Sequence, residues 1–308
     1  MTTTTGATLA PAAPSQALAE QHPEHFDPPF ERCGACGSAD IQLWYRDWRG
    51  NDIWRCSDCA VQFQNPQYSA AYLNDYYGNY VKGKKDNPAA FYASHRYKVE
   101  LLNRFTSAAA SDRGRLLDVG CGKGFMLRAA ADTGWTPEGY DVDADTTRMI
   151  SGQTGIAIRT GDFTAIDWPE QHYDAIVLSH VIEHLKSPHA YLDVFERVLK
   201  PGGLLLVAAP NIGSFAARLK QWMERSGLRK KGVGDYYDTD HHLWYYTPTS
   251  LRRLLESRGY EVLYTRADRG ARKLKTPRKR LIKRLLGFTE TTILGSTFLV
   301  ICRKRSQA

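Results

Sequence analysis

Four of the six cysteines stand in two pairs whose spacing is typical of a metal site. The pattern is Cys33-x2-Cys36-x19-Cys56-x2-Cys59, which matches a four-thiolate zinc ribbon in which two short knuckles hold one tetrahedral ion. Four thiolates leave no coordination position for water or substrate, so we expect a structural rather than a catalytic zinc. Disulfide pairing is the weaker alternative, because nothing in the sequence indicates an oxidising compartment.

The ribbon is predicted to span residues 30–66, with the short runs 41–44 and 52–55 pairing as a hairpin. Residues 1–29, which begin rich in Thr, Ala and Pro, are predicted to form a disordered tail. The remaining cysteines, Cys121 and Cys302, do not lie in runs that activate a thiolate, so we expect packed side chains.

A second chemical feature is the run Leu116-Leu117-Asp118-Val119-Gly120-Cys121-Gly122-Lys123-Gly124. An apolar strand ends in an acid and then in alternating glycines that open a helix. Glycines allow a tight turn and a close approach of the backbone, so this loop is predicted to hold a nucleoside-like cofactor. A dinucleotide fingerprint would need a third glycine at position 125, where the chain has Phe125.

The elements that position this loop follow in a regular order. A helix over 125–133 leads to a second strand ending at Asp141, at the distance expected for an acid that receives both ribose hydroxyls. A third strand near 156–160 precedes Asp162 and Phe163. The run 173–179 is predicted to be a buried parallel strand, because it is continuously apolar after its acidic start.

These motifs, with Glu183-His184-Leu185 and the run 199–203 (Leu-Lys-Pro-Gly-Gly), resemble the class I S-adenosylmethionine-dependent methyltransferases. The resemblance is to their ubiquinone and sugar O-methyltransferase branch, and it covers roughly residues 113–266. It implies an α/β fold with a Rossmann-like, doubly wound, seven-stranded sheet in residues 113–308. The last strand, 296–303, is expected to be antiparallel at or near the edge.

The resemblance also implies S-adenosylmethionine as the cofactor. The residues expected to bind it lie at the ends of the first four strands: Asp118, Gly120, Cys121, Gly122, Gly124, Asp141, Val142, Asp162, Phe163 and Ser179. The linker 67–112 is predicted to be helical and to cover the cofactor, with Tyr80 and Arg96 as lid contacts. The alternative for the linker's many tyrosines is that they pack the ribbon against the helices.

A methyl transfer to oxygen needs a group that removes a proton, and histidine titrates in the right range. Four histidines are candidates. His180 and His184 follow the fourth strand and would share one face if that segment were helical, but a packing role is equally open. His242 is the first choice for the base and His241 the reserve, because related sugar and lipid-intermediate methyltransferases carry a similar histidine here.

The chain has a formal net charge of +8, and much of it lies near residues 266–284. A cap, a proline at the first position and a closing glycine predict a basic helix over 272–287. This helix could bind membrane headgroups or a phosphate-bearing acceptor, or it could dock by its leucines with a solvated basic back. Two insertions are expected, near 211–246 and 267–293.

The length of 308 residues suggests a catalytic domain with a smaller module. No apolar stretch reaches the roughly 18 residues that a membrane-spanning helix needs, and no signal-peptide pattern is present. We therefore expect a cytoplasmic protein, with contact at the inner face of the membrane as an option.

The expected activity is O-methylation of a sugar, a glycan or a lipid-linked small molecule. The alternatives are sugar C-methylation and methylation of RNA. The sequence lacks the [DN]-P-P-[FY] motif after the fourth strand that methylation of base amines typically uses. A zinc-ribbon binding protein without activity is disfavoured, because every cofactor motif is intact.

Overall fold

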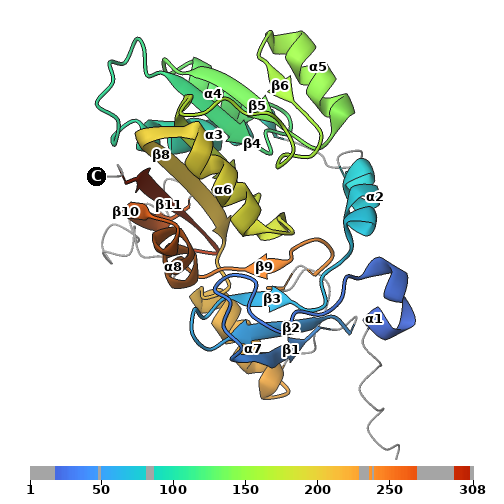
Figure 1. Ribbon diagram of the computed structural model, residues 1–308. Helices are drawn as coiled ribbons and strands as arrows, with labels where there is room; N and C mark the ends of the chain where they lie inside the picture. Colours follow the sequence, from blue (N-terminus) through green and yellow to red (C-terminus); the bar gives the residue numbers. More distant parts are fainter. Residues whose placement is uncertain are drawn as a thin grey trace, which may run out of the picture.

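The structure is a computed structural model that describes residues 18–47, 50–80, 87–228, 236–237, 239–268 and 295–305. It contains a large sheet flanked by helices and a small sheet beside it (Figure 1). The predicted basic helix 272–287, and nearly all of the insertion 267–293, lie outside the described residues.

The large sheet has seven strands in the order β10-β11-β8-β7-β4-β5-β6. The strands are β4 (Arg115–Val119), β5 (Thr136–Tyr140), β6 (Ile158–Arg159), β7 (Tyr173–Ser179), β8 (Leu199–Pro210), β10 (Tyr260–Ala267) and β11 (Thr297–Lys304). β11 is antiparallel to both neighbours, whereas β4 to β8 are parallel. The predicted doubly wound, seven-stranded sheet is confirmed, and the last strand lies one position inside the edge.

The helices begin where the sequence offers caps. They are α1 (Leu18–Gln21), α2 (Ala70–Tyr80), α3 (Pro88–Leu102), α4 (Phe125–Ala131), α5 (Ala144–Thr154), α6 (Pro188–Val198), α7 (Phe215–Arg225) and α8 (Pro248–Ser257), with single 3-10 turns at Pro23–His25 and Ile182–His184. Thr247 forms a capping box with Ser250 at the start of α8, and Pro248 follows it. A cap satisfies backbone N–H groups that the first turn leaves without partners, so this pair of residues fixes the start of α8.

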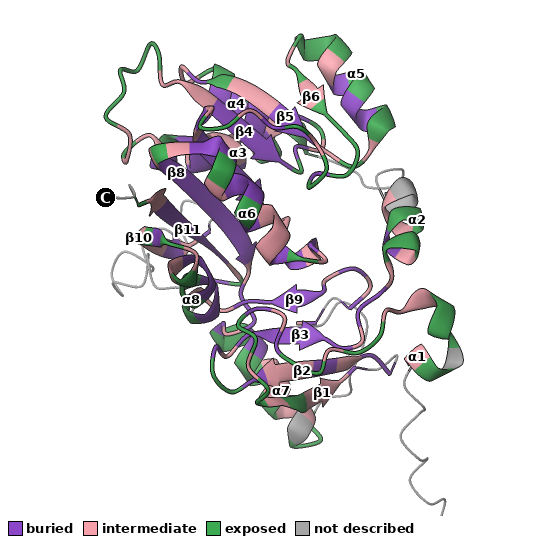
Figure 2. Cartoon of the chain, in the orientation of Figure 1, coloured by how far each residue is buried: buried purple, intermediate pink, exposed green. Residues whose placement is uncertain are grey.

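Helices cover both faces of the large sheet, and successive side chains along a strand pack against opposite faces. Leu116 faces a cluster that includes Val99 of α3 and Met126 of α4. Its neighbour Leu117 faces the opposite cluster, which includes Phe195 of α6 and Leu254 of α8. Burial on both faces explains the continuous apolar runs of the central strands β7 and β8 (Figure 2).

The small sheet has four strands in the order β1-β2-β3-β9: β1 (Ile41–Arg46), β2 (Asp52–Cys56), β3 (Gln62–Gln64) and β9 (Trp244–Tyr245). The first three strands belong to the predicted ribbon. The fourth comes from the segment before α8, and it pairs Trp244 with Phe63. Ribbon residues therefore share one hydrophobic cluster with the large sheet, and the ribbon is not a separate unit.

The predicted tail 1–29 is ordered in its second part. From α1 onward the chain docks on the residues after the ribbon, where the ring of Phe26 stacks on Tyr68 at 4.7 Å between centroids. The backbone N–H of Asp27 donates to Gln67 O at 2.9 Å, and its carboxylate accepts from Lys186. Burying an aromatic ring and pairing a charge offset the entropy of ordering this segment, which composition alone does not reveal.

Among the described residues, none of the helices combines the length and apolar character that crossing a bilayer requires.

Candidate active site and cysteine cluster

The glycine loop follows β4 and turns sharply into α4. Gly120, Gly122 and Gly124 have φ angles of 74°, 46° and 72°, a region that favours glycine. A Cβ on Gly120 would lie 2.5 Å from Cγ2 of Val181, so the loop touches the segment after β7. A Cβ on Gly122 would meet no atom within 4 Å, so this part of the loop borders open space.

Asp141 directly follows β5 and contacts the glycine loop. Its carboxylate accepts the backbone N–H of Gly122 at 2.7 Å and that of Asp143 at 3.0 Å. Each carboxylate oxygen still has acceptor capacity, which suits a pair of ribose hydroxyls. The next residue, Val142, is apolar yet 53% exposed, and it offers a surface on which a flat ring can lie.

Three histidines gather where the segment after β7 meets the segment before β9. One ligand nitrogen from each of His184, His241 and His242 lies within 4.8 Å of the others. The rings of His184 and His241 stack with centroids 4.9 Å apart, and the ring of His242 lies 4.7 Å from that of His184. Sequence positions 184 and 241 thus meet at the carboxyl ends of the parallel strands, as expected for a site on this fold.

His180 does not join this cluster. It has a φ of 61°, and only a 3-10 turn follows, so His180 and His184 are not on one face of a helix. Its ring faces Glu183, with 3.4 Å between Nδ1 and Oε1, and Asp268, with 3.7 Å between Nε2 and Oδ2. The condition under which His180 and His184 would share a face, a helix over this segment, is therefore not met.

A cavity of about 300 Å³ opens next to His242. It lies beyond the end of β8, beside α7, and has aromatic and polar walls. The lining residues are Pro210, Asn211, Ile212, Ser214, Ala216, Ala217, Lys220, Tyr236, His242, Trp244, Tyr245 and Ser296. This volume is at the small end of the range for ligand sites, so it suits a small acceptor or one unit of a larger one.

The sequence profile of the methyltransferase domain family matches residues 92–265, which is more than half of the chain. This chain belongs to the class I S-adenosylmethionine-dependent methyltransferase family. Its glycine loop, Asp141 and the strand order are the parts of that fold described above.

Two relatives carry more specific names. A ubiquinone biosynthesis O-methyltransferase of Dinoroseobacter shibae is 30% identical over 154 residues, covering 48% of this chain and 60% of that protein. One of Brucella anthropi is 26% identical over 167 residues, covering 52% and 63%. This methyltransferase therefore spans about 60% of the length of the first of these relatives and slightly more of the second.

A solved S-adenosylmethionine-dependent methyltransferase of Thermotoga maritima has the same fold. It aligns with a TM-score of 0.51 at 15% identity, covering 77% of this chain and 100% of that one.

The residues of the methyltransferase fit S-adenosylmethionine. The open space at Gly122, the carboxylate of Asp141 and the exposed Val142 suit the nucleoside. Asp162 is exposed at the end of β6, where its carboxylate accepts from Thr164. Cys121 is buried in the loop, and burial raises the pKa of its thiol, so it is a packed side chain as predicted.

Other predicted cofactor residues are placed differently. The ring of Phe163 is buried and stacks on Tyr191 at 4.5 Å, so it supports the end of β6 from inside. Arg96 pairs with Glu100 at 2.9 Å and donates to Tyr92, which in turn bonds Asp132 at the far end of α4. The structure therefore does not bring Arg96 to the glycine loop. The side chain of Tyr80 lies outside the described residues.

Two residues at this site were missed from the sequence. Lys98 of α3 is buried and donates to Oγ of Ser179 at 2.8 Å, and it pairs with Asp268 at 3.1 Å. Burial raises the pKa of the Asp268 carboxyl, but His180 and, after it, Lys98 together hold that pKa below its usual range. Lys98 could have been recognised from the sequence, because it is a lysine on an otherwise apolar helix face. Asp268 could not, because it follows an edge strand and belongs to no motif.

Asp118 lies beneath the glycine loop and is almost fully buried. Burial, followed by repulsion from Asp141, raises the pKa of its carboxyl to about 8, although Lys98 opposes this shift. Among the described residues its Oδ2 accepts no hydrogen bond. The neutral acid is therefore the favoured form at pH 7.

We expect Asp118→Asn to change how stability depends on pH. A carboxyl whose pKa is higher in the folded state stabilises the fold fully below its ordinary pKa, and this contribution is lost as pH rises toward 8. The free energy of unfolding of the wild type should fall relative to that of Asp118→Asn by up to about 1.4 kcal/mol per pH unit between pH 5 and 8. Urea unfolding at pH 5, 6.5 and 8 measures this difference.

Asp162→Asn is the matched control, because hydrogen bonds from Thr164 lower the pKa of that exposed carboxyl below this range. Its profile should run parallel to the wild type. Parallel profiles for Asp118→Asn and the wild type would contradict a protonated Asp118.

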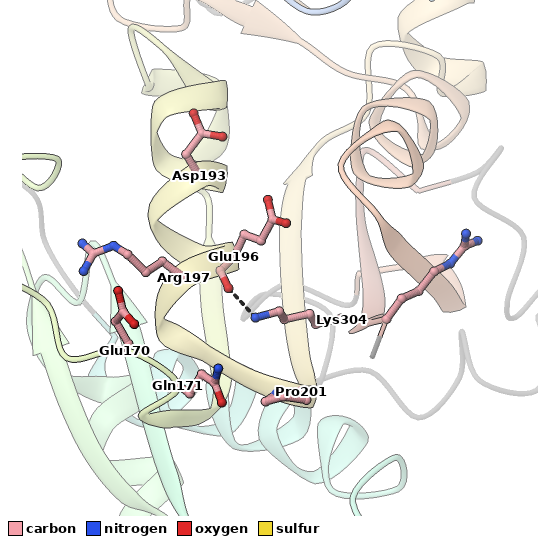
Figure 3. Close-up of a pocket in the computed structure, with 8 residues that line it drawn as sticks. Glu170, Gln171, Asp193, Glu196, Arg197, Pro201 and Lys304 are labelled. Carbon is pink, nitrogen blue, oxygen red and sulfur yellow. Dashed lines mark hydrogen bonds between the residues drawn. The ribbon is translucent and has the colours of Figure 1, made fainter. Parts of the chain in front are cut away.

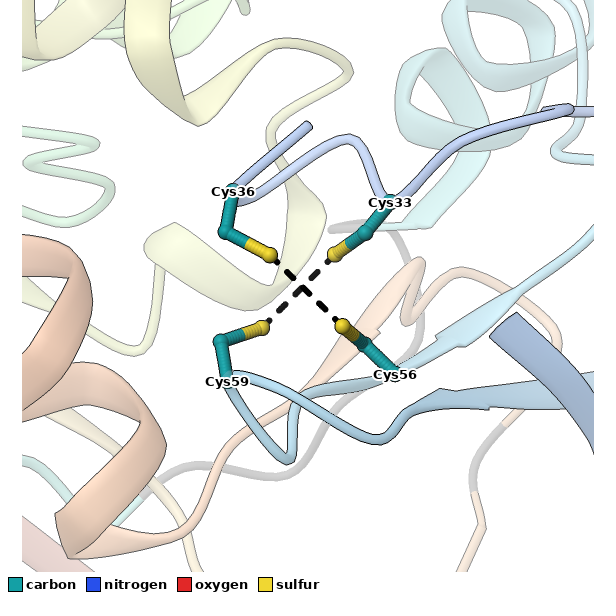
Figure 4. A group of neighbouring side chains, drawn as sticks. All are labelled: Cys33, Cys36, Cys56 and Cys59. Atoms are coloured by element: carbon teal, nitrogen blue, oxygen red, sulfur yellow. Dashed lines mark hydrogen bonds between the residues drawn. The ribbon is translucent and has the colours of Figure 1, made fainter. Parts of the chain in front are cut away.

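The four ribbon cysteines converge on one point (Figure 4). The sulfur atoms of Cys33 and Cys59 are 3.7 Å apart, and those of Cys36 and Cys56 are 3.6 Å apart. A tetrahedral zinc with bonds of about 2.3 Å would separate its sulfur ligands by about 3.8 Å. All four thiols are reduced, and their geometry fits a closed zinc site.

A further hollow of about 450 Å³ lies at the opposite end of the large sheet (Figure 3). Acidic and basic side chains alternate around it, including Glu170, Asp193 and Arg197. Lys304 donates to the backbone oxygen atoms of Glu196 and Leu199, so its charge is already engaged. The hollow is remote from the carboxyl ends of the parallel strands, where ligands bind in this fold.

Proposed function

We propose that this methyltransferase transfers a methyl group from S-adenosylmethionine to a hydroxyl oxygen of a sugar, a glycan or a lipid-linked small molecule. The observation that carries the proposal is the position of the cavity at His242. It lies next to the three-histidine cluster, and that cluster adjoins the glycine loop through Val181. The names of the relatives, which are O-methyltransferases, support oxygen as the acceptor atom.

The protein's task is mainly one of positioning. S-adenosylmethionine supplies an activated methyl group when bound, so the chain must align an acceptor oxygen and exclude water. Asp141 and the glycine loop orient the nucleoside, and the aromatic walls of Tyr236 and Tyr245 hold the acceptor. His242 is the only histidine among the residues that line the cavity, so we assign the proton to it first.

The imidazoles of His184 and His241 form hydrogen bonds with other parts of the chain. Nδ1 of His184 lies 3.1 Å from the carbonyl oxygen of His241, and a carbonyl can only accept, so this nitrogen is the donor. Nδ1 of His241 lies 3.1 Å from the hydroxyl of Tyr76 on α2, and its ring is buried. These contacts favour His242 over His241 and His184 as the group that meets the acceptor.

We further propose that the cysteine cluster holds one structural zinc. The separations of the sulfur atoms support this, and all four coordination positions are filled by thiolates. The metal then stabilises the ribbon, whose third strand pairs with β9 directly after the two histidines. Its role in methyl transfer is to support the acceptor side of the site.

His242→Ala is expected to lose methyl transfer while cofactor affinity stays unchanged. Removal of a general base typically lowers the rate about 10²–10⁴-fold, and His242 does not line the nucleoside space. The assay follows labelled methyl transfer to a panel of nucleotide sugars, lipid-linked glycans, catechols and RNA transcripts. Calorimetric titration with S-adenosylhomocysteine reports cofactor affinity.

His172→Ala is the matched control, since His172 precedes β7 at the opposite end of the strand. It should keep full activity. Transfer to RNA alone would replace the small-molecule acceptor with the nucleic-acid alternative. Full activity of His242→Ala with an inactive His184→Ala would move the base to His184.

A further inference from the structure

The three-histidine cluster has the composition of a metal site that is separate from the cysteines. His184, His241 and His242 each bring one ligand nitrogen within 4.8 Å of the others. A first-row ion with bonds of about 2.1 Å separates the nitrogen atoms of a tetrahedral site by about 3.4 Å. Binding of an ion would turn the rings of His184 and His241 out of their present stack, in which 8° separates their planes.

The contacts around the rings resemble those around metal ligands. A histidine that binds a metal through one nitrogen usually donates from the other to a carbonyl, a carboxylate or a hydroxyl. Nδ1 of His184 donates to the carbonyl oxygen of His241, which leaves Nε2 as the nitrogen with the lone pair. Nδ1 of His241 lies 3.1 Å from the hydroxyl of Tyr76, and in the tautomer in which this nitrogen donates, Nε2 carries the lone pair of a ligand.

A buried anion next to the cluster supplies an independent reason for a cation here. Glu183 is 1% exposed and directly precedes His184. Within the described part of the chain neither of its carboxylate oxygens accepts a hydrogen bond, although Oε1 lies 3.4 Å from Nδ1 of His180. His180 is one partner of this buried carboxylate, and a metal ion at the neighbouring histidines would bring a second positive charge close to it.

We propose that His184, His241 and His242 bind one divalent transition-metal ion whose remaining coordination position faces the acceptor cavity. Three imidazoles suit zinc, cobalt, nickel or iron, and a three-histidine set with an open position is typical of catalytic rather than structural sites. Because His242 lines the cavity, an ion bound to it would present its open coordination position to the acceptor.

This inference deepens the proposed function and, for its chemical role, rests on it. The ion would bind the hydroxyl oxygen of the acceptor and favour loss of its proton to solvent water. The oxygen lone pair then forms the new O–CH3 bond, while the S–CH3 bond breaks and its electron pair stays on sulfur as a neutral thioether. His242 would act as a ligand of the ion, and the effect of His242→Ala would be loss of that ligand.

Cobalt titration tests the site independently of activity. The full-length chain is first loaded with one equivalent of Zn²⁺ per chain, which the four thiolates hold more tightly than three imidazoles do, and is desalted. It is then titrated with Co²⁺ by calorimetry and absorption. We expect one Co²⁺ per chain in addition to the thiolate-bound zinc, with visible bands that lack thiolate charge transfer. His184→Ala and His242→Ala should each weaken this binding by more than 100-fold, whereas His172→Ala should leave it unchanged.

Two results would overturn the site. One is a wild-type chain that takes up metal only at its cysteines. The other is cobalt binding that persists in a His184→Ala/His242→Ala double variant. Affinity for S-adenosylhomocysteine, measured on each variant, shows whether the large sheet remains folded, so that a lost site can be distinguished from a lost fold.

Activity separates the role of the ion from the proposed function. On an acceptor found with the panel above, protein stripped of the histidine-bound ion should lose most methyl transfer and regain it with Co²⁺ or Zn²⁺. Unchanged transfer after stripping would overturn the chemical role and leave His242 as a base. Stoichiometric cobalt binding without transfer to any hydroxyl acceptor would support the site and contradict the proposed function.

Discussion

Cys56→Ser is expected to abolish zinc binding and to lower methyl transfer by at least about 100-fold, while S-adenosylhomocysteine binding stays close to that of the wild type. Structural zinc contributes about 10–16 kcal/mol in zinc-finger peptides, which is far more than a four-stranded sheet of this size can replace. Without zinc the ribbon loses β3, and β9 loses its only pairing partner in the described sheet. His241 and His242 stand just before β9 and would lose their support.

Metal analysis, transfer assays and calorimetry on the same preparations check this result. Asp58→Ser is the matched control, because this exposed residue lies between Cys56 and Cys59 and is not a ligand. It should keep zinc and activity. Absence of zinc from wild-type protein purified without chelators, or full activity of Cys56→Ser, would contradict the proposal.

Gly122→Val is expected to weaken cofactor binding by about 100-fold while the protein remains folded. No atom of the described chain lies within 4 Å of the position that a Cβ would take, so the valine would fill the space assigned to the nucleoside. Overfilling a tight site costs about 1–3 kcal/mol, which corresponds to roughly 5–150-fold in affinity. Titration with S-adenosylhomocysteine measures the loss.

The backbone strain of this change needs its own control. Gly155 caps α5 with a φ of 69° and also has no neighbour within 4 Å of a Cβ, but it lies at the other end of the sheet. Gly155→Val should therefore show similar thermal destabilisation with unchanged cofactor affinity. Equal losses of affinity in both variants would mean that strain, and not the cofactor space, explains the effect.

The large sheet could be predicted because the sequence features that specify its strands and helices lie close together along the chain. β7 is continuously apolar where it is buried on both faces, and the cap at Thr247 fixes the start of α8 through a side chain three residues from its partner. The cysteine site could be predicted for the same reason, because its four cysteines form two Cys-x2-Cys pairs that need only one hairpin to bring them together. Each of these features depends on residues close in sequence or on a known strand order.

The rest of the site depends on contacts between distant residues. β9 has two residues, and nothing near Trp244 indicates that Phe63 is its partner. The separation of His180 from His184 follows from a left-handed residue that helical spacing does not anticipate. Lys98 would be exposed on most helices, and it is buried here because Asp268 and Ser179, both far along the chain, offer it partners.

The pairing of β3 with β9 also means that the small sheet cannot be completed until long after the ribbon has been synthesised. Roughly 180 residues separate the two strands, which at about 5–20 residues per second corresponds to about 10–35 s of translation. During that interval the nascent ribbon can bind metal, but the open edge of β3 stays exposed to other chains. The ribbon thus emerges from the ribosome well before β9, the strand that completes its sheet.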